Sequence, residues 1–219
     1  MADTTTKKIA IIVASVRTPR VGPQVVEVIH EIIKKSPVYA STAITVVDIA
    51  SFNLPIFDEK VAPATLTSPE TQFEHEHSRK WSAAIAPYDG YIFVSPEYNG
   101  GVPGAAKNAV DYLFKEWTGK PMFIITYGIF GGSSSSLAWR DTFEVMRMRV
   151  LPTRPQLKWS GGGHGPDSMA AVTQGTLGEA TRKDWPENTE VVQGFEELLD
   201  FVRNKERQGT RVVLDRLGL

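Results

Sequence analysis

The sequence predicts an α/β fold, a doubly wound parallel β-sheet with helices on both faces. Short apolar runs of strand-forming residues alternate along the chain with longer segments of helical periodicity. A turn rich in glycine, serine or proline follows several of these runs and precedes the next helix. Five such units, joined by right-handed crossovers, form a five-stranded sheet.

The first two strands and the helix between them are the clearest elements. The run KKIAIIVAS, residues 7–15, is apolar almost throughout, as expected of a strand buried on both faces. Pro23 suits the first turn of a helix, and apolar residues recur at helical spacing after it, at Val25, Ile29, Ile32 and Ile33. The run STAITVVDIA, residues 41–50, predicts the second strand. A proline-bearing connection then leads to a polar helix over 70–86.

The remaining units repeat this alternation. Strands are expected at 90–95, 120–128 and, more weakly, 149–159, and helices at 103–117, 134–148 and 187–207. Residues 160–186 have no strong period and are expected to form a long surface loop that can contain short helices. We therefore expect one domain over residues 1–219, with a core at 8–159, the loop at 160–186 and a C-terminal helix at 187–207.

The composition limits the classes of function. The chain has 24 Lys and Arg against 25 Asp and Glu, and no basic run, so neither nucleic acid nor an anionic membrane is an expected partner. No apolar stretch approaches the roughly eighteen residues of a membrane span, and the polar start MADTTTKK is unlike a secretion signal, so a cytoplasmic location is expected. There are no cysteines, so redox chemistry would require a bound cofactor.

Ligands of doubly wound sheets bind beyond the carboxyl ends of the strands, so the loop after the first strand is the first candidate site. In this loop Ser15, Arg17, Thr18 and Arg20 lie just before a helix whose first amides are unpaired. Hydroxyl, amide and guanidinium donors at a helix N-terminus suit a phosphate group. The alternative is a surface turn with solvated arginines. The loop has neither a G-x-x-x-x-G-K-[ST] nor a G-x-G-x-x-G pattern, which disfavours a P-loop NTPase and an ordinary dinucleotide fold.

The loop after the third strand, SPEYNGGVPG at 95–104, suits a planar ring. Pro96 stiffens the exit from the strand, Tyr98 offers a flat aromatic side chain, and Asn99 and Gly100 permit backbone conformations that bring amides close to a heterocycle. The alternative is a tight turn into a helix that starts at Pro103.

The loop after the fourth strand, YGIFGGSSSS at 127–136, brings further amides to the same edge of the sheet. Gly128, Gly131 and Gly132 precede a serine run that can cap a helix. A flexible glycine and serine loop is the alternative. Together the three loops indicate a ligand with a phosphate at one end and a planar ring system at the other.

With these loops the chain resembles the NAD(P)H-dependent FMN reductase family of flavodoxin-like quinone and azo-dye reductases. The shared motifs are ASVR at 14–17, PEYN at 96–99, KNAVD at 107–111 and YGIFGG at 127–132. The resemblance covers about residues 8–151. The chain departs from the family at Ala14, where glycine is usual, and at Pro19 and Arg20, where small or polar residues are usual.

The resemblance implies a flavodoxin-like sheet of order 2-1-3-4-5 and an FMN that is bound noncovalently. It implies that NADPH or NADH reduces the FMN by hydride transfer and that a quinone or similar acceptor reoxidises it in a ping-pong cycle, with no catalytic acid, base or nucleophile. It also implies a homodimer or higher homo-oligomer. The expected cofactor-binding residues are Ser15, Arg17, Arg20 and Val21 for the phosphate, Pro96, Glu97, Tyr98, Asn99 and Gly100 for the ring, and Gly128 and Gly131 for its pyrimidine end.

A second class of function stays open, a flavodoxin-like FMN-binding protein that carries electrons or docks to a partner without oxidising NAD(P)H. The near-neutral charge disfavours an electron carrier, which usually has an acidic surface for steering. A metal site is not expected, because His75 and His77 are two apart on a predicted helix and should face different directions.

Overall fold

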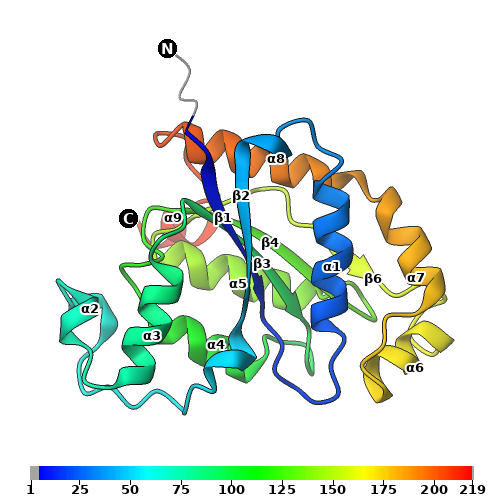
Figure 1. Ribbon diagram of the computed structural model, residues 1–219, viewed down its shortest axis with the longest axis horizontal. Coiled ribbons are helices and arrows are strands. Elements are labelled where there is room, and N and C mark those ends of the chain that lie inside the picture. The colour runs from blue at the N-terminus through cyan, green and yellow to red at the C-terminus, as the bar shows by residue number, and fades with distance from the viewer. Residues whose placement is uncertain (1–4, 219) are drawn as a thin grey trace.

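The computed structural model describes residues 5–218 and contains the expected parallel sheet. Its strands lie in the order β2-β1-β3-β4-β5, which confirms the predicted order (Figure 1). All strand pairs are parallel. The strands are β1 (Lys7–Val13), β2 (Thr42–Asp48), β3 (Gly90–Pro96), β4 (Pro121–Gly128) and β5 (Arg149–Val150).

Helices cover both faces of the sheet, and successive residues of each central strand enter opposite cores. In β1, Ile9 and Ile11 pack with α1 (Gly22–Ile33) and α8 (Thr189–Arg203), whereas Ala10 and Ile12 belong to the second core. The helices of this second core are α3 (Glu76–Ile85), α4 (Gly104–Asp111) and α5 (Ser133–Val145). The central strands are therefore buried on both sides, as their near-continuous apolar runs predicted.

The predicted fifth strand at 149–159 is two short strands in the structure. β5 pairs with the beginning of β4, and β6 (Gln156–Lys158) pairs with its end. Pro152 and Pro155 lie between them, and a proline has no amide hydrogen to donate to a strand ladder. The chain therefore leaves the sheet edge after Val150 and returns to it at Gln156.

The predicted helix at 70–86 is also interrupted. It forms α2 (Pro69–Gln72) and α3, with Phe73 extended and buried between them. The carboxylate of Glu59 accepts hydrogen bonds from the amides of Glu74 and His75, at 2.8 and 3.0 Å. These two bonds occupy amides that a continuous helix would use internally.

Three other helices are shorter than predicted. The helix expected at 103–117 ends at Asp111, because Trp117 folds back into the core and its indole donates to the carbonyl of Val110. The helix expected at 134–148 ends at Val145, and the one expected at 187–207 ends at Arg203, since Asn204 is extended. A further helix, α9 (Val212–Leu217), was not predicted.

The segment 160–186 contains short helices, which the sequence allowed for. It contains α6 (Pro166–Thr173) and α7 (Glu179–Asp184), which lie beside α1 in Figure 1. Short 3₁₀ turns occupy Tyr39–Ser41, Ile49–Phe52, Pro63–Thr65 and Trp185–Glu187. Within residues 5–218 no helix is long and apolar enough to cross a membrane.

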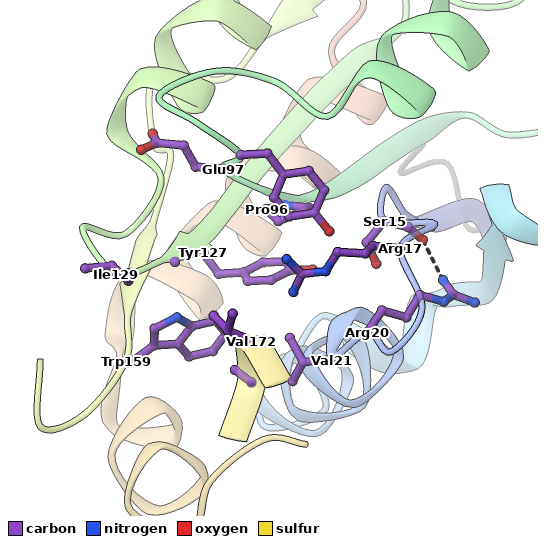
Figure 2. Close-up of a pocket in the computed structure, with 13 residues that line it drawn as sticks. Ser15, Arg17, Arg20, Val21, Pro96, Glu97, Tyr127, Ile129, Trp159 and Val172 are labelled. Carbon is purple, nitrogen blue, oxygen red and sulfur yellow. Dashed lines mark hydrogen bonds between the residues drawn. The ribbon is translucent and has the colours of Figure 1, made fainter. Parts of the chain in front are cut away.

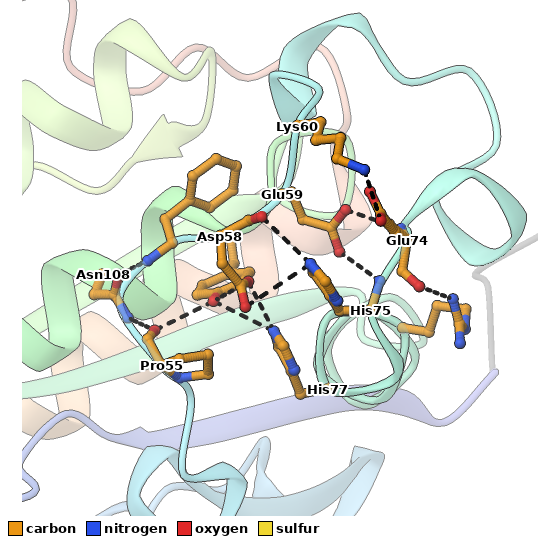
Figure 3. A network of polar contacts seen from close by, with 11 residues as sticks. Pro55, Asp58, Glu59, Lys60, Glu74, His75, His77 and Asn108 are labelled. Carbon is orange, nitrogen blue, oxygen red and sulfur yellow. Dashed lines mark hydrogen bonds and ion pairs between the residues drawn. The ribbon is translucent and has the colours of Figure 1, made fainter.

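A polar network fastens the connection after β2 to α3 and α4 (Figure 3). The carboxylate of Asp58 lies 2.9 Å from His77 Nε2 and accepts a hydrogen bond of 2.9 Å from Tyr112. The rings of His75 and His77 are stacked, with centroids 5.1 Å apart, so the expectation that they face different directions was wrong. The reason is that His75 precedes the helix, which begins at Glu76. Among the described residues no group of three or more His, Asp or Glu side chains could hold a metal ion.

Candidate cofactor site

A pocket lies beyond the carboxyl ends of β1, β3 and β4, where the sequence placed the ligand (Figure 2). The three predicted loops all contribute to its lining, which confirms that they converge. Eight of the expected residues line it: Ser15, Arg17, Arg20, Val21, Pro96, Glu97, Tyr98 and Gly128. Asn99, Gly100 and Gly131, which were also expected, do not line it.

Ser15 lies at the base of the pocket with an unused hydroxyl group. Its side chain is buried, and within the described chain its Oγ atom has no hydrogen-bond partner of acceptable geometry. Gly22 faces it at the start of α1, where a Cβ atom would lie 2.0 Å from Ser15 Oγ. The hydroxyl of Tyr127 is close enough for Ser15 to lower the Tyr127 pKa, but Ser15 makes no well-formed hydrogen bond in the described chain and so has a donor available for a bound group.

The N-terminus of α1 points to the same place and has no compensating charge. No side chain caps it, and no acidic residue lies in its first turn. The amides of Gly22 and Gln24 donate to no acceptor in the part of the chain that the structure describes. Unpaired amides and the positive end of the helix dipole favour an anion here.

The two arginines of the first loop have different surroundings. Arg20 contacts the carboxylate of Asp48 through both terminal nitrogens, at 2.9 and 2.5 Å, and donates to the carbonyl of Ser15 at 2.6 Å. The hydrogen bond with Asp48 raises the pKa of Arg20 above its ordinary value. Arg17 has no acidic partner within residues 5–218, and its guanidinium group lies over the ring of Tyr98, 5.1 Å from the centroid. Arg17 is therefore the cation that is available to an anionic ligand.

The PEYN turn is a tight two-residue hairpin. Tyr98 and Gly101 exchange backbone hydrogen bonds of 3.1 and 3.0 Å, and the residues between them, Asn99 and Gly100, have φ angles of 52° and 72°. Asn-Gly is the pair that favours such a turn, because both positions require positive φ. The turn holds Tyr98 at the pocket and leaves Asn99 and Gly100 outside its lining.

Glu97 and Gly131 have evident structural contacts. The carboxylate of Glu97 accepts hydrogen bonds from the amides of Ser134 and Ser135, at 2.8 and 3.1 Å, and so caps α5. Gly131 packs against β6, since a Cβ atom on it would lie 2.7 Å from the carbonyl oxygen of Gln156. In the third loop, Gly128 lines the pocket directly.

Five further residues line the pocket that were not among the expected site residues: Tyr127, Ile129, Trp159, Ala171 and Val172. Tyr127 and Ile129 belong to the YGIFGG motif, whose apolar residues could line a ring site or simply close the end of the sheet. Trp159 packs against Tyr127 with ring centroids 5.6 Å apart. Ala171 and Val172 come from α6, and no motif in the segment 160–186 indicated them.

The ionisable groups at the pocket are not arranged for acid–base chemistry near neutral pH. Burial raises the pKa of the Tyr127 phenol well above its ordinary value, so this group stays protonated. Burial also raises the pKa of Tyr98, an effect that the nearby Arg17 and Arg20 oppose. Glu97 and Arg20 are occupied by the contacts described above. What the pocket offers is hydroxyl and amide donors, one available guanidinium group and aromatic surface.

Comparison with known proteins agrees with this geometry. A sequence model of the family described as NADPH-dependent FMN reductase matches residues 7–157. An NAD(P)H-dependent FMN reductase of Nectria sp is 44% identical over 200 residues, which cover 90% of this chain and 97% of that protein. A quinone reductase of Pseudomonas putida is 28% identical over 150 residues, 65% of this chain and 73% of that protein. The flavoenzyme NAD(P)H:acceptor oxidoreductase of Paracoccus denitrificans has the same fold, with a TM-score of 0.59 at 16% identity over 87% of this chain and 98% of that one.

Proposed function

The chain belongs to the NADPH-dependent FMN reductase family, and from this premise we propose that it binds FMN in the pocket and transfers electrons from NAD(P)H to a quinone or similar acceptor. The observation that carries the proposal is the buried hydroxyl of Ser15, which makes no well-formed hydrogen bond in residues 5–218, beside the uncapped N-terminus of α1. A phosphate would satisfy this hydroxyl and the unpaired amides together.

The residues present fit FMN. At the phosphate end, Ser15 and the first amides of α1 supply neutral donors, and Arg17 supplies a charge that no carboxylate neutralises in residues 5–218. Arg20 lines the pocket, but with its guanidinium group bound to Asp48 it holds the carbonyl of Ser15 in place. At the other end, Pro96, Tyr98, Gly128 and Trp159 offer flat or apolar surface for a ring system.

When bound, FMN supplies the hydride-accepting and electron-donating chemistry. The chain binds and orients it. The Asn99–Gly100 turn fixes Tyr98 at the pocket, and the capping contact of Glu97 fixes the end of β3 to α5. Tyr127 and Trp159 form an apolar base that excludes water. No side chain at the pocket is required to act as an acid, base or nucleophile.

An anaerobic titration tests this function. The purified protein should be yellow, NADPH should bleach it, and a benzoquinone should restore the colour. Steady-state rates with NADPH and the quinone should give parallel double-reciprocal lines, because both substrates react in turn at one site. A yellow protein that NADPH does not bleach would instead favour the electron carrier or docking protein, and a protein that binds no FMN would contradict both.

The proposal includes self-association. Phe130, near the pocket, and Leu137, on α5, are 71% and 48% exposed and would suit contacts with a second copy of the chain. We expect a homodimer or a higher homo-oligomer, measurable by analytical ultracentrifugation. The pair of Lys107 and Asp111 on α4, 2.6 Å apart, lies within one chain and does not itself indicate an interface.

A further inference from the structure

One wall of the pocket comes from α6 and from Trp159, which lie outside residues 7–157 that the family model matches. Figure 2 shows Val172 between Trp159 and Val21, at the side of the pocket away from Glu97. Ala171 is buried behind it, while Val172 is 46% exposed. Val172 is therefore in contact both with the pocket and with solvent.

The contacts of the following turn hold α6 in this position. The side chain of Gln24, in the first turn of α1, donates to the carbonyl of Gly175 at 2.8 Å and accepts from the amide of Leu177 at 3.1 Å. Gly175 packs so closely on the first loop that a Cβ atom on it would lie 2.5 Å from the amide nitrogen of Arg20. The wall formed by α6 therefore packs against the loop after β1, where the phosphate of FMN is proposed to bind.

The other end of α6 is fixed as well. Asp167 is buried, and its carboxylate accepts a 2.6 Å hydrogen bond from the amide of Thr181 in α7. Ser168 donates to the carbonyls of Gly163 and Gly165 at 2.7 and 3.0 Å. With both ends held, the position of Val172 relative to the pocket is defined by the fold.

A second apolar side chain lines the pocket. Ile129, which follows β4, lines the pocket and is 39% exposed. The loop after β6 packs against it, because a Cβ atom on Gly163 would lie 2.6 Å from Ile129 Cγ2. Two half-exposed branched side chains, Ile129 and Val172, therefore line the pocket, whereas the charged Arg17 belongs to the first loop.

We propose that Val172 is a specificity-determining residue, which favours electron acceptors that carry an apolar substituent beside their reacting ring. The inference rests on the proposed function, since it concerns the acceptor of that same site. The substituent would lie between Val172 and Ile129 and lose its contact with water. A small hydrophilic acceptor such as ferricyanide would gain nothing from this surface.

The test compares Val172→Thr, which keeps the shape and adds a hydroxyl, with Met169→Gln on the same helix. Met169 is 50% exposed, close to the exposure of Val172, but does not line the pocket. For each variant, kcat/KM is measured with an unsubstituted benzoquinone, an alkyl-substituted benzoquinone and ferricyanide, at saturating NADPH.

Val172→Thr should lower kcat/KM for the alkyl-substituted quinone, mainly through KM, by about three- to tenfold more than it lowers kcat/KM for ferricyanide. Met169→Gln should change none of the three. An unchanged preference in Val172→Thr, an equal loss with all three acceptors, or the same loss in Met169→Gln would overturn the inference. A wild-type protein that reduces no acceptor would instead contradict the proposed function itself, so the two failures are distinguishable.

Discussion

Arg20 and Asp48 form a two-pronged ion pair that joins the first loop to the end of β2, with contacts of 2.9 and 2.5 Å. The same guanidinium group donates to the carbonyl of Ser15 at 2.6 Å. From the sequence, Arg20 was expected to bind the phosphate directly. From these contacts we propose that Arg20, held by Asp48, positions the turn that presents Ser15.

Asp48→Asn tests this positioning. The amide keeps the size of the side chain but removes the charge, so Arg20 becomes free to leave Ser15. We expect FMN affinity to fall roughly tenfold, about 1.4 kcal/mol, as measured by quenching of flavin fluorescence. The matched control is Asp141→Asn, which removes the partner of Arg140 on α5 and should leave affinity unchanged. Equal affinities in wild type and Asp48→Asn would show that the ion pair does not position the loop.

Arg17→Ala removes the guanidinium group that has no acidic partner in residues 5–218. A charge-assisted contact to a phosphate contributes about 1.5 to 3 kcal/mol, so FMN affinity should fall from about tenfold to more than a hundredfold. Arg216→Ala, at an exposed position on α9, is the control and should have no effect. If the Arg17 variant binds FMN as tightly as the wild type, Arg17 does not contact the phosphate.

Gly22→Ala tests the close packing at the start of α1. Its Cβ atom would lie 2.0 Å from Ser15 Oγ and 3.1 Å from the hydroxyl of Tyr127, so the base of the pocket must shift. We expect a loss of about 1 to 3 kcal/mol in unfolding free energy and weaker FMN binding. Gly104→Ala is the matched control at the first residue of α4, where a Cβ atom meets nothing within 4 Å. A Gly22 variant as stable as the Gly104 variant would contradict the described packing.

The sheet and the location of the pocket could be predicted because they depend on local patterns. Apolar runs such as residues 7–15 and 120–128 define buried strands, and the order of the units fixes which loops meet. The helix ends could not be predicted in this way. Glu59 interrupts the helix at 70–86 from a position eleven residues before it, and Trp117 ends α4 by a buried contact rather than by a capping motif.

Only the site residues that belong to recognisable motifs could be predicted. ASVR and PEYN brought Ser15, Arg17 and Tyr98 to the pocket, as expected from the ends of β1 and β3. The contribution of α6 was missed because its packing depends on Gln24 and Gly175, which are 151 residues apart in the sequence. The pairing of Arg20 with Asp48, 28 residues apart, was missed for the same reason.

The free energy of unfolding should depend on pH through the protonation of His30. Its Nε2 atom lies 2.8 Å from the hydroxyl of Tyr39, and burial, with a smaller effect of Lys34, lowers the pKa of His30 below its ordinary 6.5. Between the lowered pKa and 6.5 the unfolded chain binds more protons than the folded one, so stability falls as the pH drops below about 6.5.

Urea unfolding at about pH 7.5 and about pH 5.5 measures this effect. The wild type should lose more unfolding free energy on acidification than His30→Gln, which has no proton to gain at this position. His164→Gln, at an exposed residue of the loop after β6, should behave as the wild type does. The same loss in all three proteins would show that His30 contributes nothing to the pH dependence.

The central claim is that the pocket holds FMN with its phosphate on Ser15, Arg17 and the N-terminus of α1. Parallel titrations of the protein with FMN and with riboflavin, which lacks the phosphate, test it most directly. FMN should bind at least about a hundredfold more tightly than riboflavin, roughly 2.7 kcal/mol, and Arg17→Ala should reduce this ratio. Equal affinities of the wild-type protein for FMN and riboflavin would contradict it.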